Sequence, residues 1–314
     1  LNQFFSKTYN ESRSKFIKES SNIKGAIIES LPINNDDNLY IDLTYIPGTS
    51  NCKQLLLHVS GTHGCEGFAG SAIQIRVLSN TLPNIYELNE YDIIPNILFI
   101  HGLNPYGMKY GRRFTNDNID LNRNCIFDNK TWETIKINNN SNKYDEYKKW
   151  DWLINPKRKP TIFKDDIWIW IQMIKGVIQY GIKAAKKIVS GGQYFKENGI
   201  FFGGFELSKE HRMVSEYIQS NECINKFGIN LINDIESLTI IDIHTGFGGS
   251  NTDTLLLQNS KDESITNKLF PHFATVIPKD ISRDDTYGMI ASKEGYSMLF
   301  KNVKQHNLYS IIHE

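Results

Sequence analysis

Apolar residues in this chain recur mainly at the spacing of buried β-strands. Residues 38–46 alternate between apolar and polar positions, and residues 54–59 form a short, nearly continuous apolar run. An alternating segment is typical of a strand with one buried face, whereas a continuous run is typical of a strand buried on both faces. We expect four further strands, at residues 97–101, 238–243, 254–257 and 308–312. Residues 254–257 could lie beside residues 238–243.

Other segments have helical spacing. Residues 1–30 place Phe5, Tyr9, Phe16 and Ile23 at loosely helical intervals, and residues 68–78 also have a helical pattern. Both segments are therefore expected to be helices.

The most apolar stretch of the chain runs from Ile167 to Ile188. It is interrupted by lysines at positions 175, 183, 186 and 187. Such interruptions indicate an amphipathic helix rather than a membrane span. Residues 129–162, by contrast, are rich in Asn and Lys and contain Pro156 and Pro160. We expect this region to be a surface insertion that is partly loop.

The order of strands, glycine-rich turns and helices predicts the fold class. It favours an α/β fold with a mixed, mostly parallel twisted sheet and helices on both faces, forming a single domain over residues 1–314. His63, His244 and Glu314 each follow a predicted strand. Ligands of such sheets collect at the carboxyl ends of the strands, so we expect these three residues to lie in one region.

Composition narrows the possible functions only slightly. Lys plus Arg and Asp plus Glu number 35 each, so no charge bias points to nucleic acid or to an anionic membrane. The four cysteines show no CxxC spacing, which favours reduced thiols in an intracellular protein. No signal peptide is recognisable at the start of the sequence, and we expect a cytoplasmic protein.

Candidate metal ligands occur in two of the segments that follow strands. His63 and Glu66 are three residues apart and can chelate one ion, although this spacing alone is weak evidence. His244 ends a predicted strand, and alternation places Asp242 on the same side, where it could orient the imidazole or act as a structural carboxylate. Two imidazoles and one carboxylate form the ligand set of a catalytic zinc ion that keeps one position open for water.

Positive charge is available close to these residues in sequence. Arg113 and Arg123 lie ten residues apart, and Asn122 precedes the second arginine. Arginine stays charged at any working pH and presents a planar fork that matches a carboxylate. The segment from Asp120 to Asn124 is too dense in polar groups to be only a solvated surface.

The ordered set of these motifs resembles the zinc carboxypeptidases. His63-Gly64-Cys65-Glu66, Arg113, Asn122-Arg123 and His244 follow that family's site pattern, and Asn104-Pro105-Tyr106-Gly107 is similar to its Asn-Pro-x-Gly element. The segments Ser60–Gly64, Gly192–Tyr194 and Phe202–Gly204 resemble an uncharacterised carboxypeptidase-like branch. The resemblance extends from about Phe5 to Glu314.

The resemblance implies a role for each matching residue. His63, Glu66 and His244 would bind one Zn²⁺ ion, and Arg113 would stabilise the oxyanion. Asn122 and Arg123 would hold the substrate carboxylate, Glu314 would be the general base, and Tyr296, in preference to Tyr287, would close over the substrate. Because members of the family continue after the base, we expect the domain to lack its C-terminal segment here.

The implied activity is zinc-dependent hydrolysis of a peptide or amide bond next to a free carboxylate, acting on a small peptide or an amino-acid conjugate. An N-acyl amino acid deacylase of the same fold and a zinc-binding protein without catalysis remain alternatives. A serine hydrolase and a thermolysin-type protease are disfavoured, because the sequence contains neither GxSxG nor HExxH. We expect no nucleic-acid or membrane partner, and the sequence leaves the oligomeric state open.

Overall fold

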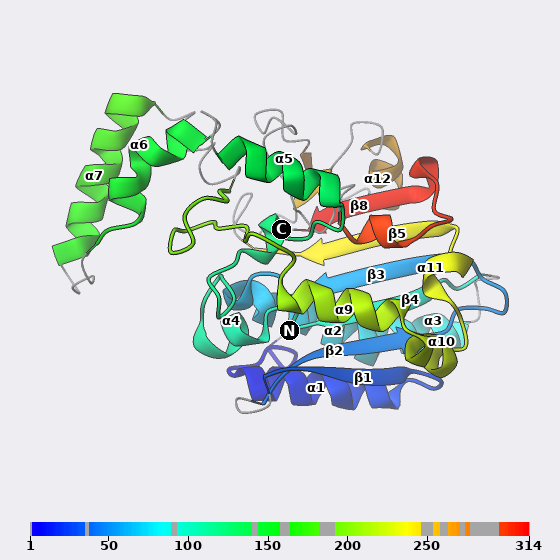
Figure 1. The fold of residues 1–314 in the computed structure, drawn as a ribbon. Coiled ribbons are helices and arrows are strands. Elements are labelled where there is room, and N and C mark those ends of the chain that lie inside the picture. Colours follow the sequence, from blue (N-terminus) through cyan, green and yellow to red (C-terminus); the bar gives the residue numbers. More distant parts are fainter. Residues whose placement is uncertain are drawn as a thin grey trace.

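A central β-sheet organises the chain in the computed structural model (Figure 1). The structure describes residues 2–34, 38–88, 93–139, 144–157, 164–181, 192–245, 254–257, 263–270, 274–276 and 295–313. Within these residues the sheet has eight strands in the order β1-β2-β4-β3-β5-β8-β6-β7. The strands are β1 (Ile27–Asn34), β2 (Leu39–Ile46), β3 (Gln54–Ser60), β4 (Asn96–His101), β5 (Ser237–Ile243), β6 (Thr254–Leu257), β7 (Ala274–Val276) and β8 (Leu308–His313).

The centre of the sheet is parallel and its flanks are mixed. Strands β4, β3, β5 and β8 are parallel neighbours, as are β6 and β7. The pairs β1–β2, β2–β4 and β6–β8 are antiparallel. This arrangement confirms the predicted mixed, mostly parallel sheet.

Two of the local predictions were wrong. The segment expected to be one helix over residues 1–30 divides into helix α1 (Tyr9–Asn22) and strand β1. Strand β1 contains Pro32, which an edge strand tolerates because one side of its backbone needs no ladder hydrogen bond. Strand β6 pairs with β7 and β8 rather than with β5, because β8 occupies the edge of β5.

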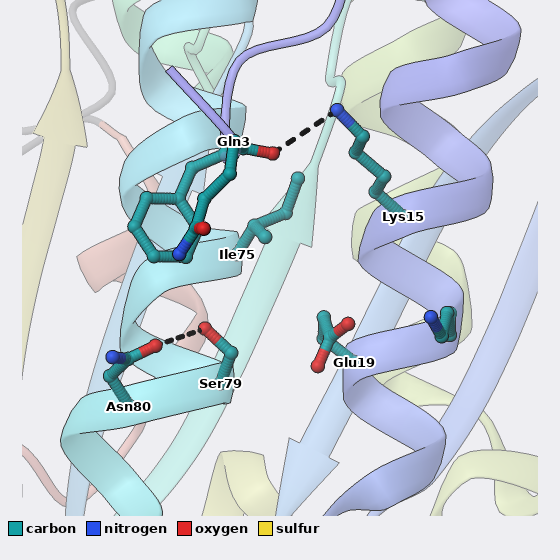
Figure 2. Close-up of a pocket in the computed structure, with 8 residues that line it drawn as sticks. Gln3, Lys15, Glu19, Ile75, Ser79 and Asn80 are labelled. Carbon is teal, nitrogen blue, oxygen red and sulfur yellow. Dashed lines mark hydrogen bonds between the residues drawn. The ribbon is translucent and has the colours of Figure 1, made fainter. Parts of the chain in front are cut away.

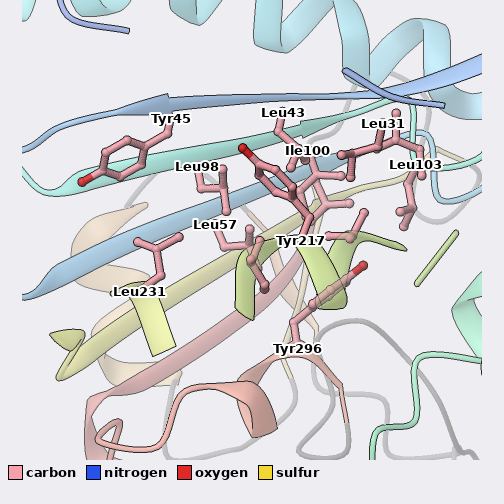
Figure 3. Close-up of a cluster of buried hydrophobic side chains, with 14 of the residues drawn as sticks. Leu31, Leu43, Tyr45, Leu57, Leu98, Ile100, Leu103, Tyr217, Leu231 and Tyr296 are labelled. Carbon is pink, nitrogen blue, oxygen red and sulfur yellow. The ribbon is translucent and has the colours of Figure 1, made fainter. Parts of the chain in front are cut away.

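Helices cover both faces of the sheet (Figure 1). On one face, Phe16 and Ile75 pack with Phe99 of β4, and on the other, Tyr217 and Leu231 pack in the same cluster as Leu98 of β4 (Figure 3). Successive residues of a strand point to opposite faces, so β4 contributes to both cores. Outside residues 129–180, the described α-helices are α1, α2 (Gly67–Arg76), α3 (Leu82–Leu88), α4 (Pro105–Tyr110), α9 (Lys209–Gln219), α10 (Asn221–Phe227), α11 (Leu231–Asp234) and α12 (Glu263–Leu269).

A surface cavity of about 320 Å³ lies between the start of the chain, α1 and the π-helical segment Val77–Thr81 (Figure 2). Lys15 and Lys18 line it from α1, and Ile75 and Asn80 line it from the other side. None of the residues that line this cavity belongs to the motifs singled out in the sequence.

The region predicted to be a partly looped insertion contains two helices, α5 (Asn129–Asn139) and α6 (Asp145–Ile154). Helix α5 buries Trp132 and Ile135 in a cluster with Tyr194, so this Asn-rich sequence forms a packed element. Helix α7 (Lys164–Tyr180) follows. Across the described parts of the chain, no helix combines the length and apolarity needed to cross a bilayer.

Candidate metal centre

The parallel pairing of β3 and β5 brings the candidate ligands His63 and His244 together. Ser60, the last residue of β3, pairs with Ile243, the last residue of β5, so both chains leave the sheet at the same edge. His63 lies three residues past β3, and His244 follows β5 directly. A 3₁₀ turn at Gly64–Glu66 returns Glu66 to the same point. The expectation that strand ends gather His63 and His244 is therefore confirmed.

His63, Glu66 and His244 form a close triangle of potential ligand atoms. The two Nδ1 atoms are 3.1 Å apart. Glu66 Oε1 lies 3.1 Å from Nδ1 of His63, and Oε2 lies 3.3 Å from Nδ1 of His244. Two nitrogen ligands at about 2.0–2.1 Å from one tetrahedral zinc ion lie roughly 3.3 Å apart. The observed spacing is therefore close to that of ligands sharing one ion.

Two buried carboxylates determine which ring nitrogens face this point. Asp120 Oδ1 lies 3.2 Å from Nε2 of His63, and Asp242 Oδ2 lies 2.7 Å from Nε2 of His244. Thr62 donates a hydrogen bond of 2.8 Å to the other oxygen of Asp242. Because an ionised carboxylate only accepts, each Nε2 must donate its proton. In the neutral rings, both Nδ1 lone pairs then face Glu66 and each other.

Three electron-rich atoms that converge in this way can hold a metal ion or share a proton. Two nitrogens and a carboxylate suit zinc, and the outer carboxylates match the usual support of a metal-bound histidine. Without a metal ion, a proton must serve. Burial lowers the pKa of His244, but Asp242 and Glu66 outweigh it and raise that pKa to about 10. Burial raises the pKa of the Glu66 carboxyl, but His244 and His63 outweigh this effect and hold that pKa well below its usual range.

Asp120 links the cluster to Arg113. Its second oxygen accepts a 3.0 Å hydrogen bond from Nε of Arg113, and its first also accepts the backbone N–H of Asn122 at 3.0 Å. Burial opposes the charge on Asp120, but Arg113 and His63 hold its pKa well below the ordinary value. Nη1 of Arg113 lies 3.6 Å from Glu66 Oε1, so a cationic side chain borders the three ligands.

The Asn104–Gly107 motif fixes the loop that carries Arg113. Asn104 caps helix α4: its side chain accepts the N–H of Gly107 at 2.8 Å and donates to the carbonyl of Arg113 at 3.0 Å. The backbones of Gly64 and Gly107 also touch, and a Cβ at Gly64 would lie 2.0 Å from the carbonyl carbon of Gly107. Glycine at position 64 therefore lets the His63–Glu66 turn pack against α4.

Asn122 and Arg123 lie in a 3₁₀ turn, Leu121–Arg123, and are both buried. Nη1 of Arg123 donates to the carbonyl of Asn122 at 2.5 Å, and the hydroxyl of Tyr194 donates to the carbonyl of Arg123 at 2.5 Å. Burial lowers the pKa of Arg123 against the opposing effect of Asp120. Among the described residues, Oδ1 of Asn122 is a buried amide oxygen without a hydrogen-bond partner.

The two other predicted site residues differ in their outcome. Glu314 lies outside the described residues, as does Tyr287; the preceding residue, His313, accepts the backbone N–H of His244 at 2.7 Å through its carbonyl. Tyr296 is fully buried, and its hydroxyl lies 3.1 Å from Nδ1 of His211. The prediction that Tyr296 closes over substrate stays a prediction.

Sequence reasoning gave no role to Asp120 or Thr62. Asp120 contacts His63 across 57 residues of chain, and Thr62 contacts Asp242 across 180. The dense polar run from Asp120 to Asn124 was the available signal for Asp120. The suggested contact between Asp242 and His244 is confirmed by the 2.7 Å distance.

The chain is similar to several solved structures. Bovine thrombin-activatable fibrinolysis inhibitor, solved with tick carboxypeptidase inhibitor, is 12% identical, with 98% of this chain and 85% of that chain covered and a TM-score of 0.51. A candidate carboxypeptidase A from Shewanella denitrificans OS-217 is 14% identical, with 99% and 61% covered and a TM-score of 0.47. A candidate succinylglutamate desuccinylase/aspartoacylase from Shewanella frigidimarina NCIMB 400 is 14% identical, with 93% and 65% covered and a TM-score of 0.44.

The chain therefore spans less than two thirds of the length of the two Shewanella proteins. Among curated proteins, none matches this sequence. Residues 5–314 match the family described as "Protein of unknown function (DUF2817)", which is nearly the whole sequence. The chain belongs to this family, and its fold is that of the metallocarboxypeptidases.

Proposed function

We propose that this chain is a zinc-dependent hydrolase that cleaves a peptide or amide bond next to a free carboxylate. The observation that supports it most is the convergence of Nδ1 of His63, Nδ1 of His244 and the carboxylate of Glu66, with a carboxylate behind each imidazole. These three residues would hold one Zn²⁺ ion. When bound, zinc supplies an acidified water and polarises the carbonyl of the bond to be cleaved.

The surrounding side chains supply positive charge in two places. Arg113 is 29% exposed and is oriented by Asp120, so its guanidinium can stabilise an oxyanion that develops beside the ligands. The second charge, Arg123, is buried, as is its neighbour Asn122; the guanidinium and the amide Nδ2 of Asn122 would donate hydrogen bonds to a substrate carboxylate. This pair would select substrates with a free carboxylate next to the cleaved bond.

A general base must accept a proton from the attacking water. We assign this role to Glu314, because its covalent neighbour His313 is paired with Ile243 at the strand end that carries His244. A carboxylate at that position could then pass the proton to the leaving amine. Tyr296 has no part in this proposal.

Deacylation of an N-acyl amino acid is the second candidate activity. Its substrate also offers a free carboxylate, which the Asn122–Arg123 pair fits equally well. A zinc-binding protein without catalysis is the third possibility, and it would use the same three ligands without turnover.

A substrate panel separates these activities. Zinc-loaded protein would be assayed with peptides that end in a free carboxylate, the same peptides amidated, and N-acyl amino acids, with Glu314→Gln as the matched variant. We expect turnover only with a free carboxylate, and Glu314→Gln is expected to lose turnover while keeping zinc. Equal cleavage of amidated peptides would contradict the assignment of Asn122 and Arg123, and stoichiometric zinc without any turnover would favour the third possibility.

A further inference from the structure

Helix α7 presents a continuous apolar stripe to solvent. Ile167, Trp170, Ile171, Ile174 and Ile178 are between 46% and 79% exposed. Their spacing of i, i+3, i+4, i+7 and i+11 places them on one side of the helix. Among the helix residues whose side chains the structure describes, only Lys175 is charged, and it borders the stripe.

The opposite side of α7 is already used within the chain. It packs on α6, where a Cβ at Gly176 would lie 2.5 Å from the ring of Trp150 and the rings of Trp150 and Tyr180 are 5.8 Å apart. Val177 joins the same cluster. The helix is thus apolar both where it is packed and where it faces solvent. An exposed apolar stripe of this size marks an interaction surface.

We propose that this stripe binds the same stripe of a second copy of the chain. The five residues repeat at the spacing of a helix–helix seam, and the stripe itself contains no charge. Two copies related by a two-fold axis would bring identical patches together, so each copy would bury the surface that the other exposes.

The size and position of the stripe fit such a contact. At the observed exposures, its side chains would remove on the order of 600 Å² per copy from water, against about 800 Å² per partner in a typical stable interface. Helix α6 lies between α7 and the sheet, so the α6–α7 pair projects from the body of the protein (Figure 1). Two such pairs can form a four-helix bundle without contact between the two sheets.

An anionic membrane fits the stripe less well. Helices that lie in a membrane interface carry several Lys or Arg residues on their polar face. Among the described side chains of α7, Lys175 is the only basic residue. The inward side of the helix is packed on α6. A second copy of the chain therefore fits the stripe better than an anionic lipid surface does.

Sedimentation equilibrium of the whole chain tests this inference. We expect the wild type to be a dimer at micromolar concentration and the double variant Ile174→Glu/Ile178→Glu to be a monomer. The matched control is Ile137→Glu, an isoleucine of α5 that is 72% exposed and lies outside the stripe; it should stay dimeric. Circular dichroism and zinc content should be the same in all three proteins, which separates loss of association from loss of folding.

Cross-linking gives a second measurement that does not depend on a disruptive charge. A thiol introduced by Ile174→Cys lies on the stripe and should be joined by a short bis-maleimide, beyond the background of the native exposed Cys65. Ile137→Cys should show only that background. The proposal would be overturned if the wild type were a monomer or if the double variant remained a dimer. It would also be overturned if the wild type sedimented with phosphatidylserine vesicles and the double variant did not.

Discussion

Oδ1 of Asp120 lies 3.2 Å from Nε2 of His63, and its other oxygen lies 3.0 Å from Nε of Arg113. One buried carboxylate therefore orients both a proposed zinc ligand and the proposed oxyanion-stabilising arginine. The contacts of Asp242 among the described side chains are with the ligand His244 and the hydroxyl of Thr62. The two outer carboxylates should accordingly be separable by experiment.

Replacing each carboxylate by its amide should produce different defects. Asp242→Asn is expected to weaken zinc binding by about 10- to 100-fold while leaving kcat at saturating zinc nearly unchanged. Asp120→Asn should weaken zinc binding similarly and also lower kcat, because Arg113 loses its orienting partner. Chelator competition and turnover at saturating zinc measure the two effects, with Asp151→Asn as a control at a carboxylate that pairs with Lys196. Identical kcat values for Asp120→Asn and Asp242→Asn would refute the link to Arg113.

Charge alone should not replace Arg113. Arg113→Lys keeps a positive charge but loses the planar group that donates to Asp120 through Nε. We expect kcat to fall by about 100-fold or more, as for the loss of one oxyanion donor, with zinc content unchanged. Steady-state kinetics with parallel metal analysis measure this. A lysine variant with wild-type kcat would remove Arg113 from the proposed chemistry.

Glu210 should make the stability of the fold depend on pH. It is buried in the first turn of α9, and burial raises its pKa from 4.5 to about 7. The folded state then binds the proton more tightly than the unfolded state. The contribution of the protonated form to stability is therefore full below about pH 4.5 and is lost as the pH rises through 7.

The variant Glu210→Gln should remove this dependence. Relative to the wild type, it should gain stability between pH 5 and pH 8, by at most on the order of 3 kcal/mol. Urea unfolding at several pH values measures the difference, and Glu206→Gln, at an exposed carboxylate, serves as the control. Parallel pH profiles for the wild type and Glu210→Gln would show that Glu210 does not titrate in this range.

Local sequence patterns predicted the strands that build the centre of the sheet and the gathering of His63 and His244 at its edge. This succeeded because a buried parallel strand has an apolar signature and because its carboxyl end has a fixed location. Strand β1 was missed because Pro32 and short apolar runs mask an edge strand. The position of β6 depends on the order of β5 and β8, which no local pattern encodes.

Part of the candidate site could likewise be predicted from the sequence and part could not. The three proposed ligands stand in recognisable motifs, whereas the contact of Asp120 with His63 joins residues far apart in sequence. Tyr296 was selected through the family resemblance, and the structure places its hydroxyl in the core beside His211. Neither the contact of Asp120 with His63 nor the burial of Tyr296 has a signal in the local sequence.

The most direct test of the proposed metal centre is titration of metal-free protein with Zn²⁺, for the wild type and for Glu66→Ala. The cluster predicts one ion per wild-type chain, with X-ray absorption showing two imidazole nitrogens at about 2.0–2.1 Å. Glu66→Ala should lose stoichiometric zinc while keeping the wild-type circular dichroism spectrum. Retention of stoichiometric zinc by Glu66→Ala, or no zinc binding by the wild type, would contradict the assignment.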